Sequence, residues 1–303
     1  MSNEIIKIQN LSLCLSGKKI LNNISMTVEK NSITALVGYN GAGKSTLIKA
    51  LLGLENDYSG SIILFDSEKL EKMRSRIGAA LDIDNIKFNP LIKGRDYLKE
   101  VCYLCGESPE TEIPRVAKIL DAVGYIDKKI SAYSYGMKQR LSVAAALIGK
   151  PELLILDEPF NGIDAEGITK MRMLIKRLHK EGVTVLLTSH IITELTKLAT
   201  DFLIISGGRL NCKVSRSDLD KALIKKRIYK TDNQEYMLDK LKRKYPDVFL
   251  LPYETDYISV IGNQADLLSE FSGESYEENA LAEEILLLYM SGKDQGNEEI
   301  TTC

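Results

Sequence analysis

The stretch that decides the fold is Gly38-Tyr39-Asn40-Gly41-Ala42-Gly43-Lys44-Ser45-Thr46, which lies between the apolar run 33–37 and the helix-forming segment 47–52. Its spacing is G-x-x-x-x-G-K-[ST], the pattern of a loop that wraps phosphate groups between a strand and a helix. Glycines let the backbone approach an anion closely, and the following helix presents N–H groups and a positive dipole end. The sequence therefore predicts nucleotide binding at this phosphate loop.

Two side chains of the phosphate loop have separate chemical roles. Lys44 is expected to reach the outer phosphates, and the hydroxyl of Ser45 is expected to bind Mg²⁺. The remaining contacts with the nucleotide are assigned to Gly38, Asn40, Gly41, Gly43 and Thr46.

Length and composition limit the class of protein. The 303 residues are enough for about two domains. Charged residues make up 27% of the chain and the formal net charge is −2, so no global positive field indicates a nucleic-acid partner. No apolar run approaches the roughly 18 residues that cross a bilayer, and five scattered cysteines fit a reduced compartment. We expect a cytoplasmic protein whose membrane role, if it has one, runs through a partner chain.

The first half of the chain predicts an α/β domain with a helical insertion. Strand patterns cover residues 4–37, and the two that precede the phosphate loop are expected to form an antiparallel flap. Amphipathic segments at 94–105, 113–123 and 136–148, with breaks at Pro109, Pro114 and Gly124, predict a helical insertion over about 85–150.

The second half first returns to the α/β pattern and then changes. Apolar strands alternate with helices between residues 153 and 205, which is typical of a mainly parallel, covered sheet. We place the end of this domain at residue 214. Residues 215–303 combine short strand patterns with helical patterns at 233–244, 264–271 and 279–290, which predicts a small α+β domain with a polar tail.

An acid pair follows the predicted strand 153–156. In Leu153-Leu154-Ile155-Leu156-Asp157-Glu158-Pro159 both carboxylates stand at the carboxyl end of the strand, where open α/β sheets bind ligands. Asp157 is expected to hold Mg²⁺ directly or through water, and Glu158 to act as general base on the attacking water. Without the phosphate loop, an acid pair that simply ends a strand would be a fair alternative.

The chain has two histidines, and they differ in position. His190 ends another apolar strand in Thr188-Ser189-His190, so we assign it to the terminal phosphate, where it would orient the transition state. His179 lies in the charged helical run 176–180 and is expected on a solvated face.

The segment Tyr133-Ser134-Tyr135-Gly136-Met137-Lys138-Gln139-Arg140-Leu141 places a hydroxyl and a glycine at the start of an amphipathic helix. With Ser134 at its cap, this helix start is a second anion site. One chain would then carry two phosphate-binding ends, which makes best sense if the second serves the nucleotide of another subunit. An ordinary helix cap is the alternative.

These motifs occur in a fixed order, and in that order the chain resembles the ATP-binding subunit of an ABC transporter over residues 4–214. The order is phosphate loop 38–46, signature segment 133–141, acidic strand 153–159, loop 160–164 and His190. The resemblance implies a phosphate-loop ABC ATPase domain with ATP and Mg²⁺ as cofactors.

The resemblance also implies an assembly. Two cassettes, identical or different, would pair head to tail and sandwich two ATP molecules. In each site the residues Lys44, Ser45, Asp157, Glu158 and His190 of one chain would face Ser134 and Gly136 of the other. Asp164 resembles the dimer-contact aspartate of the family. Hydrolysis would drive a separately encoded membrane permease from the cytoplasmic face of the membrane.

Two positions depart from the general pattern of the family. The aromatic residue that stacks on adenine would fall near Leu15. In the lid loop, Ala79-Ala80-Leu81-Asp82, an acid stands where the family has the glutamine that contacts Mg²⁺, so Asp82 is kept as a candidate metal ligand.

Asp82, the form Ser134-Tyr135-Gly136-Met137 and the loop 161–164 resemble the branch of the family that exports bacitracin, lantibiotics and other amphipathic peptides. We therefore expect an ATPase that powers export of a peptide or hydrophobic compound, with its permease contact around Asp82 to Arg95. Two alternatives stay open: a soluble relative that remodels ribosomes or nucleic acid, and a binding-only partner of an active sister cassette.

Overall fold

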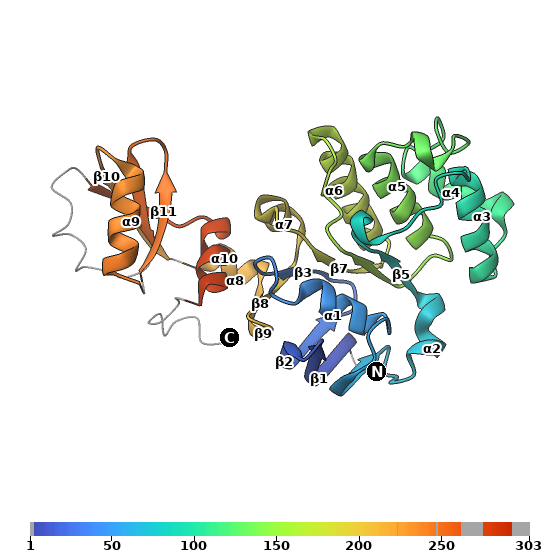
Figure 1. Ribbon diagram of the computed structural model, residues 1–303, viewed down its shortest axis with the longest axis horizontal. Coiled ribbons are helices and arrows are strands. Elements are labelled where there is room, and N and C mark those ends of the chain that lie inside the picture. The colour runs from blue at the N-terminus through green and yellow to red at the C-terminus, as the bar shows by residue number, and fades with distance from the viewer. Residues whose placement is uncertain (1–2, 223, 247, 262–274, 293–303) are drawn as a thin grey trace. The chain divides into compact units, whose positions relative to one another are not determined.

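The computed structural model describes residues 3–292 except 223, 247 and 262–274. It divides the chain into two compact units, Met1–Leu210 and Asn211–Cys303 (Figure 1). The predicted helix at 264–271 lies outside the described residues.

A six-stranded sheet positions the site. Its order is β5-β6-β7-β3-β8-β9. The strands are β5 (Ile77–Ala80), β6 (Leu153–Leu156), β7 (Thr184–Thr188), β3 (Ile33–Val37), β8 (Asp201–Ser206) and β9 (Arg209–Ser215). From β5 to β8 every neighbouring pair is parallel. Strands β3, β6 and β7 are buried at every position, which explains their continuous apolar sequences. The predicted parallel, covered sheet is confirmed.

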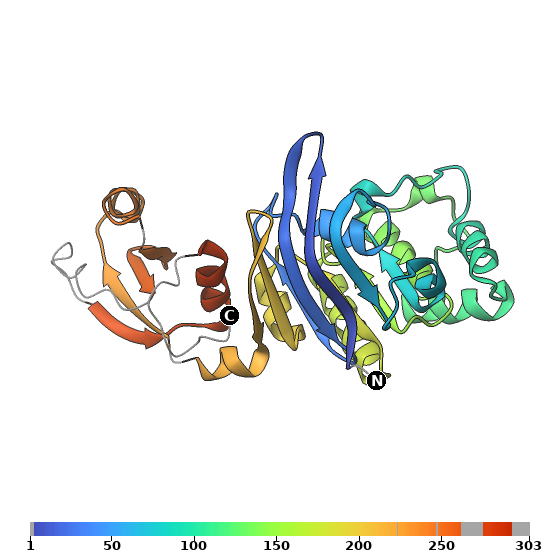
Figure 2. The same cartoon turned by 90° about the horizontal axis from the view of Figure 1, so that it is seen from below.

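A second, antiparallel sheet has the order β2-β1-β4. It consists of β1 (Glu4–Leu15), β2 (Lys18–Glu29) and β4 (Tyr58–Leu64), and Figure 2 shows β1 and β2 as a long hairpin. Helix α1 (Lys44–Leu51) buries Leu47, Ile48 and Leu51 in one apolar cluster with residues of both sheets. The antiparallel flap is confirmed, and α1 is anchored by both sheets.

The helical insertion contains α3 (Gly94–Cys105), α4 (Pro109–Ile119) and α5 (Tyr135–Ala146), after the short elements α2 (Leu70–Met73), η1 (Arg74–Arg76) and η2 (Ile83–Asn85). The predicted bounds of the middle helix, 113–123, are wrong. Pro109 starts α4 because its fixed φ suits the first helical position, and Pro114 lies inside the helix, where it was expected to break it. η3 (Ile130–Ala132) leads into α5.

Two helices follow β6 and β7. Helix α6 (Ala165–Lys180) buries Met171, Leu174, Ile175 and Leu178 on one face, and α7 (Ile192–Leu198) follows β7. His179 is half-buried rather than solvated, since it follows directly on the buried stripe of α6.

Within the described residues, the second unit contains a four-stranded antiparallel sheet with order β11-β12-β10-β13 and three helices. Its elements are α8 (Arg216–Lys221), β10 (Lys225–Lys230), α9 (Gln234–Lys244), β11 (Phe249–Tyr253), β12 (Tyr257–Ile261), β13 (Ser275–Asn279) and α10 (Ala282–Ser291). Strand β13 was not predicted, because Ser-Tyr-Glu-Glu-Asn has no apolar alternation. None of the described helices has the length and apolarity needed to cross a bilayer.

Candidate active site

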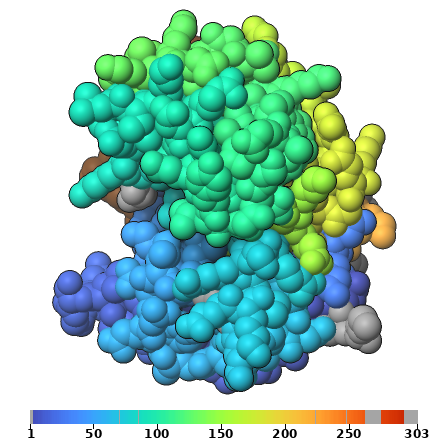
Figure 3. All heavy atoms as spheres, turned by 90° about the vertical axis from the view of Figure 1, so that its right-hand side faces the viewer, coloured from blue at the N-terminus to red at the C-terminus, as the bar shows by residue number. Residues whose placement is uncertain are grey.

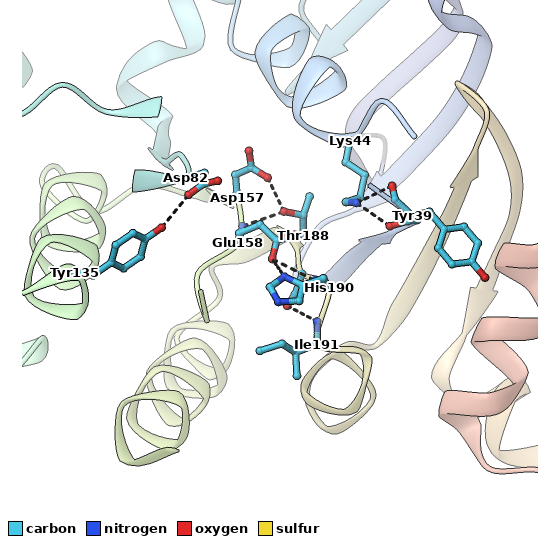
Figure 4. A network of polar contacts seen from close by, with 11 residues as sticks. Tyr39, Lys44, Asp82, Tyr135, Asp157, Glu158, Thr188, His190 and Ile191 are labelled. Atoms are coloured by element: carbon cyan, nitrogen blue, oxygen red, sulfur yellow. Dashed lines mark hydrogen bonds and ion pairs between the residues drawn. The ribbon is translucent and has the colours of Figure 1, made fainter. Parts of the chain in front are cut away.

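Four loops meet at the carboxyl edge of the six-stranded sheet. The lid loop with Asp82 follows β5, Asp157 follows β6, His190 follows β7 and the phosphate loop follows β3. Because these four strands are parallel neighbours, their carboxyl ends lie side by side, and Figure 4 shows the polar side chains that gather there. The chain therefore brings Lys44, Asp157, Glu158 and His190 to one edge.

The phosphate loop closes around its own lysine. The ammonium group of Lys44 donates to the carbonyl of Gly38 at 2.7 Å and to that of Tyr39 at 3.2 Å, and the side chain is buried. Gly43 forms the cap of α1 with φ 105°, and no side chain caps this helix start. The first N–H groups of α1 are thus open to an anion, with a cation held beside them.

Two glycines of this loop are required by space. A Cβ on Gly38 would lie 2.3 Å from the carbonyl oxygen of Ile205, which is backbone and cannot yield. A Cβ on Gly43 would lie 2.8 Å from Leu21, at a φ that L side chains rarely adopt. The loop is therefore packed against β2 and β8, and its shape follows from the fold.

The charge of Lys44 is set by burial and by the two acids. Burial lowers its pKa from the usual value, and the nearby carboxylates of Glu158 and Asp157 partly oppose that shift. The site thus combines one buried cation with two anions, and a phosphate entering it would meet the cation.

Thr188 connects the two carboxylate residues. Its hydroxyl donates to Asp157 Oδ1 at 2.6 Å and accepts from the backbone N–H of Glu158 at 3.0 Å. Thr188 and Asp157 are both almost fully buried. The sequence prediction did not assign this role, because threonine at the end of a strand is common; only its place beside β6 reveals it.

We expect Thr188→Val to lower the free energy of unfolding by about 1–3 kcal/mol and the ATPase rate by about tenfold, since it leaves two buried polar groups unpaired. Urea titration and steady-state ATPase assays measure both. Thr169→Val is the matched control, because the Thr169 hydroxyl only bonds back to Ala165 on the exposed face of α6. Equal losses in both variants would contradict the role of Thr188.

Glu158 is held by His190. The Nδ1 of His190 lies 2.9 Å from Glu158 Oε2, and the backbone N–H of His190 donates to the same oxygen at 3.2 Å. Glu158 has φ 53°, a conformation that costs energy for a residue other than glycine. The Glu158 side chain is 15% exposed and that of His190 54%, so the pair opens to solvent on the histidine side.

Asp82 lies on the same edge but is bonded to a different group. Its Oδ1 accepts from the Tyr135 hydroxyl at 3.2 Å (Figure 4). It also accepts from the N–H of Asp84 at 3.4 Å. The first of these contacts joins the lid loop to the signature segment of the same chain.

Ser134 and Gly136 line a separate cavity. Ser134 caps α5 by accepting from the N–H of Met137 at 3.3 Å. Together with Gly162 and Asp164 they border a cavity of about 680 Å³, which none of Lys44, Asp157, Glu158 and His190 lines. Asp164 caps α6 by accepting from Gly167 at 2.8 Å. The structure therefore does not join the signature segment to the phosphate loop within one chain.

Gln139 is a buried residue that the sequence prediction missed. It lies one turn after Tyr135 on α5 and is 1% exposed. Neither atom of its side-chain amide has a hydrogen-bond partner among the described residues. A polar residue on the inward face of a helix was the available signal. An unpaired buried amide costs stability, so this helix face is not optimised for the conformation observed.

Gln139→Met should raise the midpoint of thermal unfolding by roughly 2–4 °C, because an apolar side chain of similar length removes the unpaired amide. Gln139→Glu is the opposite control and should lower the midpoint, since it buries a charge. Differential scanning calorimetry on both variants measures the effect. A lower midpoint in Gln139→Met would show that the amide is satisfied in solution.

The residues at this edge fit ATP and Mg²⁺. Among the described residues no three His, Cys, Asp or Glu side chains form a metal cluster. Mg²⁺ is usually held by one or two protein oxygens together with substrate phosphates. Ser45 and Asp157 offer such oxygens, and the open start of α1 offers N–H donors.

Leu15, which falls near the position of the adenine-stacking aromatic residue of the family, packs against the apolar cluster of the two sheets.

The parallel sheet, the phosphate loop and the paired carboxylates define a phosphate-loop nucleotide hydrolase. The family model described as "ABC transporter" matches residues 21–161. The Lantibiotic transport ATP-binding protein SrtF of Streptococcus pyogenes is 41% identical over 207 residues, covering 68% of this chain and 89% of that protein. The chain belongs to the ABC transporter ATP-binding proteins, and is an ATP-binding subunit with ATPase activity.

Two further comparisons agree with this family. The Bacitracin transport ATP-binding protein BcrA of Bacillus licheniformis is 37% identical over 211 residues, covering 68% of each chain. A solved structure described as an ATP binding subunit of an ABC transporter aligns with a TM-score of 0.64 at 25% identity, covering 72% of this chain and 92% of that one.

Proposed function

We propose that this chain hydrolyses Mg-ATP to power export of an amphipathic peptide through a separately encoded membrane permease. The observation that carries the proposal is the 41% identity with a lantibiotic transport protein over nearly the whole of that protein. Similarity to a bacitracin transport protein supports the same substrate class. The chain would act at the cytoplasmic face of the membrane.

The phosphate loop binds the nucleotide and the acids act on it. On binding of ATP, Lys44 would leave the carbonyls of Gly38 and Tyr39 and turn to the outer phosphates, and Ser45 and Asp157 would hold Mg²⁺. The N–H groups at the start of α1, with the loop residues Asn40, Gly41 and Thr46, bind the remaining phosphate oxygens. When bound there, Mg²⁺ would supply charge that offsets the negative charge developing on the phosphates.

Glu158 acts as general base on the attacking water. Two contacts from His190 to Glu158 Oε2 leave Oε1 to accept the proton. His190 is exposed at the mouth of the site. There it would lie beside the terminal phosphate of bound ATP and orient that group. The low accessibility of Glu158 limits competing water.

Ser134 and Gly136 complete the site of a second cassette. They border a cavity away from Lys44 in their own chain. A head-to-tail dimer, of identical or sister cassettes, would bring this helix start to the partner's nucleotide, where its N–H groups face the terminal phosphate. Asp164, at the cap of α6, would lie at the same contact.

The surface around Asp82 to Arg95 is proposed to receive the permease. Leu91 is 71% exposed. Phe88 and Tyr97, which precede and follow it in the sequence, pack edge to face with ring centroids 5.2 Å apart. Figure 3 shows the face on which the helical insertion, in green, stands above the blue and cyan first third of the chain. Exposed Lys87 and Lys93 flank this apolar patch.

Charge reversal tests that location. Lys93→Glu should reduce permease-stimulated ATPase and transport about tenfold and leave basal ATPase unchanged. The reason is that it replaces a positive charge with a negative one at the rim of the proposed permease contact. Lys176→Glu, on the exposed face of α6, is the control. Transport that survives in Lys93→Glu and in Lys87→Glu would move the permease contact elsewhere.

The function is tested with inside-out membrane vesicles stripped of peripheral proteins. Adding the purified chain with ATP should restore uptake of a labelled lantibiotic or bacitracin, and Glu158→Gln protein should bind the vesicles without restoring uptake. Binding to ribosomes with none to membranes would contradict the proposal and favour a soluble remodelling role.

A further inference from the structure

We propose that Tyr135 is a positioning residue that orients Asp82 at the metal end of its own site and ties it to the signature segment, which serves the other nucleotide of the dimer. The inference rests on the proposed composite site. It adds a connection between the two ends of each cassette.

One oxygen of Asp82 accepts two hydrogen bonds, one of them from the hydroxyl of Tyr135. Tyr135 and the N–H of Asp84 both donate to Oδ1. No described residue donates to Oδ2, which leaves that oxygen for Mg²⁺ or one of its water ligands. Asp82 and Asp157 follow the neighbouring parallel strands β5 and β6, which pair Ala80 with Leu156. Both carboxylates therefore belong to one end of the site.

The ring of Tyr135 packs against Gly162. A Cβ on Gly162 would lie 2.3 Å from Cδ1 and 2.6 Å from Cε1 of Tyr135, so the ring rests directly on this glycine. Gly162 has φ +63° and belongs to the loop that starts just after Glu158. The side chain of Tyr135, which belongs to the signature segment, thus contacts both the lid loop and the loop that follows Glu158.

This arrangement makes the signature segment sensitive to the metal site. Ser134 and Gly136 are the sequence neighbours of Tyr135, and a Cβ on Gly136 would lie 3.0 Å from Ile163. A shift of Asp82 toward a bound metal ion therefore pulls on the start of α5. Burial and the nearby acids Asp82 and Asp84 raise the pKa of Tyr135 to about 12, so its hydroxyl remains a donor at neutral pH.

The unpaired amide of Gln139 is an independent observation on the same helix. It lies one turn along α5 from Tyr135 and is buried without a partner among the described residues. A coupled movement of α5 requires a second position of the helix that is also favourable. A position in which the Gln139 amide gains hydrogen bonds would meet that requirement.

The first test measures the metal end alone. Mn²⁺ affinity of the ATP-loaded Glu158→Gln protein is measured by electron paramagnetic resonance with and without Tyr135→Phe. We expect Tyr135→Phe to weaken Mn²⁺ binding about 3- to 10-fold, which corresponds to the net contribution of a typical hydrogen bond. Tyr125→Phe is the matched control, since the buried Tyr125 hydroxyl has no partner among the described residues.

A double-mutant cycle separates positioning from a general structural effect. In an Asp82→Ala background Tyr135→Phe should change Mn²⁺ affinity no further, because Tyr135 acts through that carboxylate. An equal shift in both backgrounds, or no shift while Asp82 is intact, would overturn the inference.

The second test measures the signature end. Light scattering gives the Mg²⁺ concentration at which ATP produces half-maximal dimer in the Glu158→Gln background, and Tyr135→Phe should raise it about 3- to 10-fold. An unchanged midpoint would refute the link to the second site. If the parent variant forms no dimer at any Mg²⁺ concentration, the proposed composite site fails, and the Mn²⁺ cycle still decides the role of Tyr135.

Discussion

Replacing Glu158 by glutamine should lower the ATPase rate about 10²- to 10⁴-fold while ATP binding persists, which is the range that a positioned general base supplies. The amide keeps the size of the side chain and can still accept from His190, so the contacts of Oε2 survive. What is lost is the oxygen that takes the proton from water in the proposed mechanism. Steady-state phosphate release and equilibrium binding of a fluorescent ATP analogue separate the two effects.

Glu181→Gln is the control for this change. Glu181 is exposed just after α6 and pairs with Arg177 on the surface, so its neutralisation should leave both the ATPase rate and ATP affinity unchanged. An ATPase rate within threefold of wild type in Glu158→Gln would assign the proton transfer to another group.

Lys44→Ala should weaken ATP binding roughly 100-fold, or about 2.7 kcal/mol. The lysine is buried beside two carboxylates, and without it a phosphate would face Asp157 and Glu158 with no cation to offset them. The variant also loses two hydrogen bonds to the phosphate loop. Isothermal titration with Mg-ATP measures the affinity directly.

Lys49→Ala, in the last turn of the same helix, is the matched control. It removes the same charge from α1 without touching the phosphate loop, so ATP affinity should hold. Equal losses in both variants would indicate that net charge, and not the position of Lys44, governs binding.

The order of the strands explains why most site residues at the carboxyl edge of the six-stranded sheet could be predicted. Apolar runs that end in Gly38, Asp157 and Ser189-His190 indicate buried parallel strands, and parallel strands place their ends together. The fold class follows from the same periodicity.

Contacts between distant segments could not be predicted. The hydroxyl of Thr188 reaches Asp157 only because β7 lies next to β6, and the Tyr135 contact with Asp82 depends on how α5 packs against β5 and η2. Neither is encoded in local spacing. The start of α4 was misplaced because Pro109 was treated as a break, although proline is favoured at a first helical position.

The most direct test of the composite ATPase site is the molar mass of Glu158→Gln protein, measured by size-exclusion chromatography with light scattering, with and without Mg-ATP. We predict a monomer without nucleotide and a species of twice that mass with Mg-ATP, lost again in Glu158→Gln combined with Lys44→Ala. A monomer at saturating Mg-ATP, with ATP shown to be bound, would contradict a site shared between two copies of this chain.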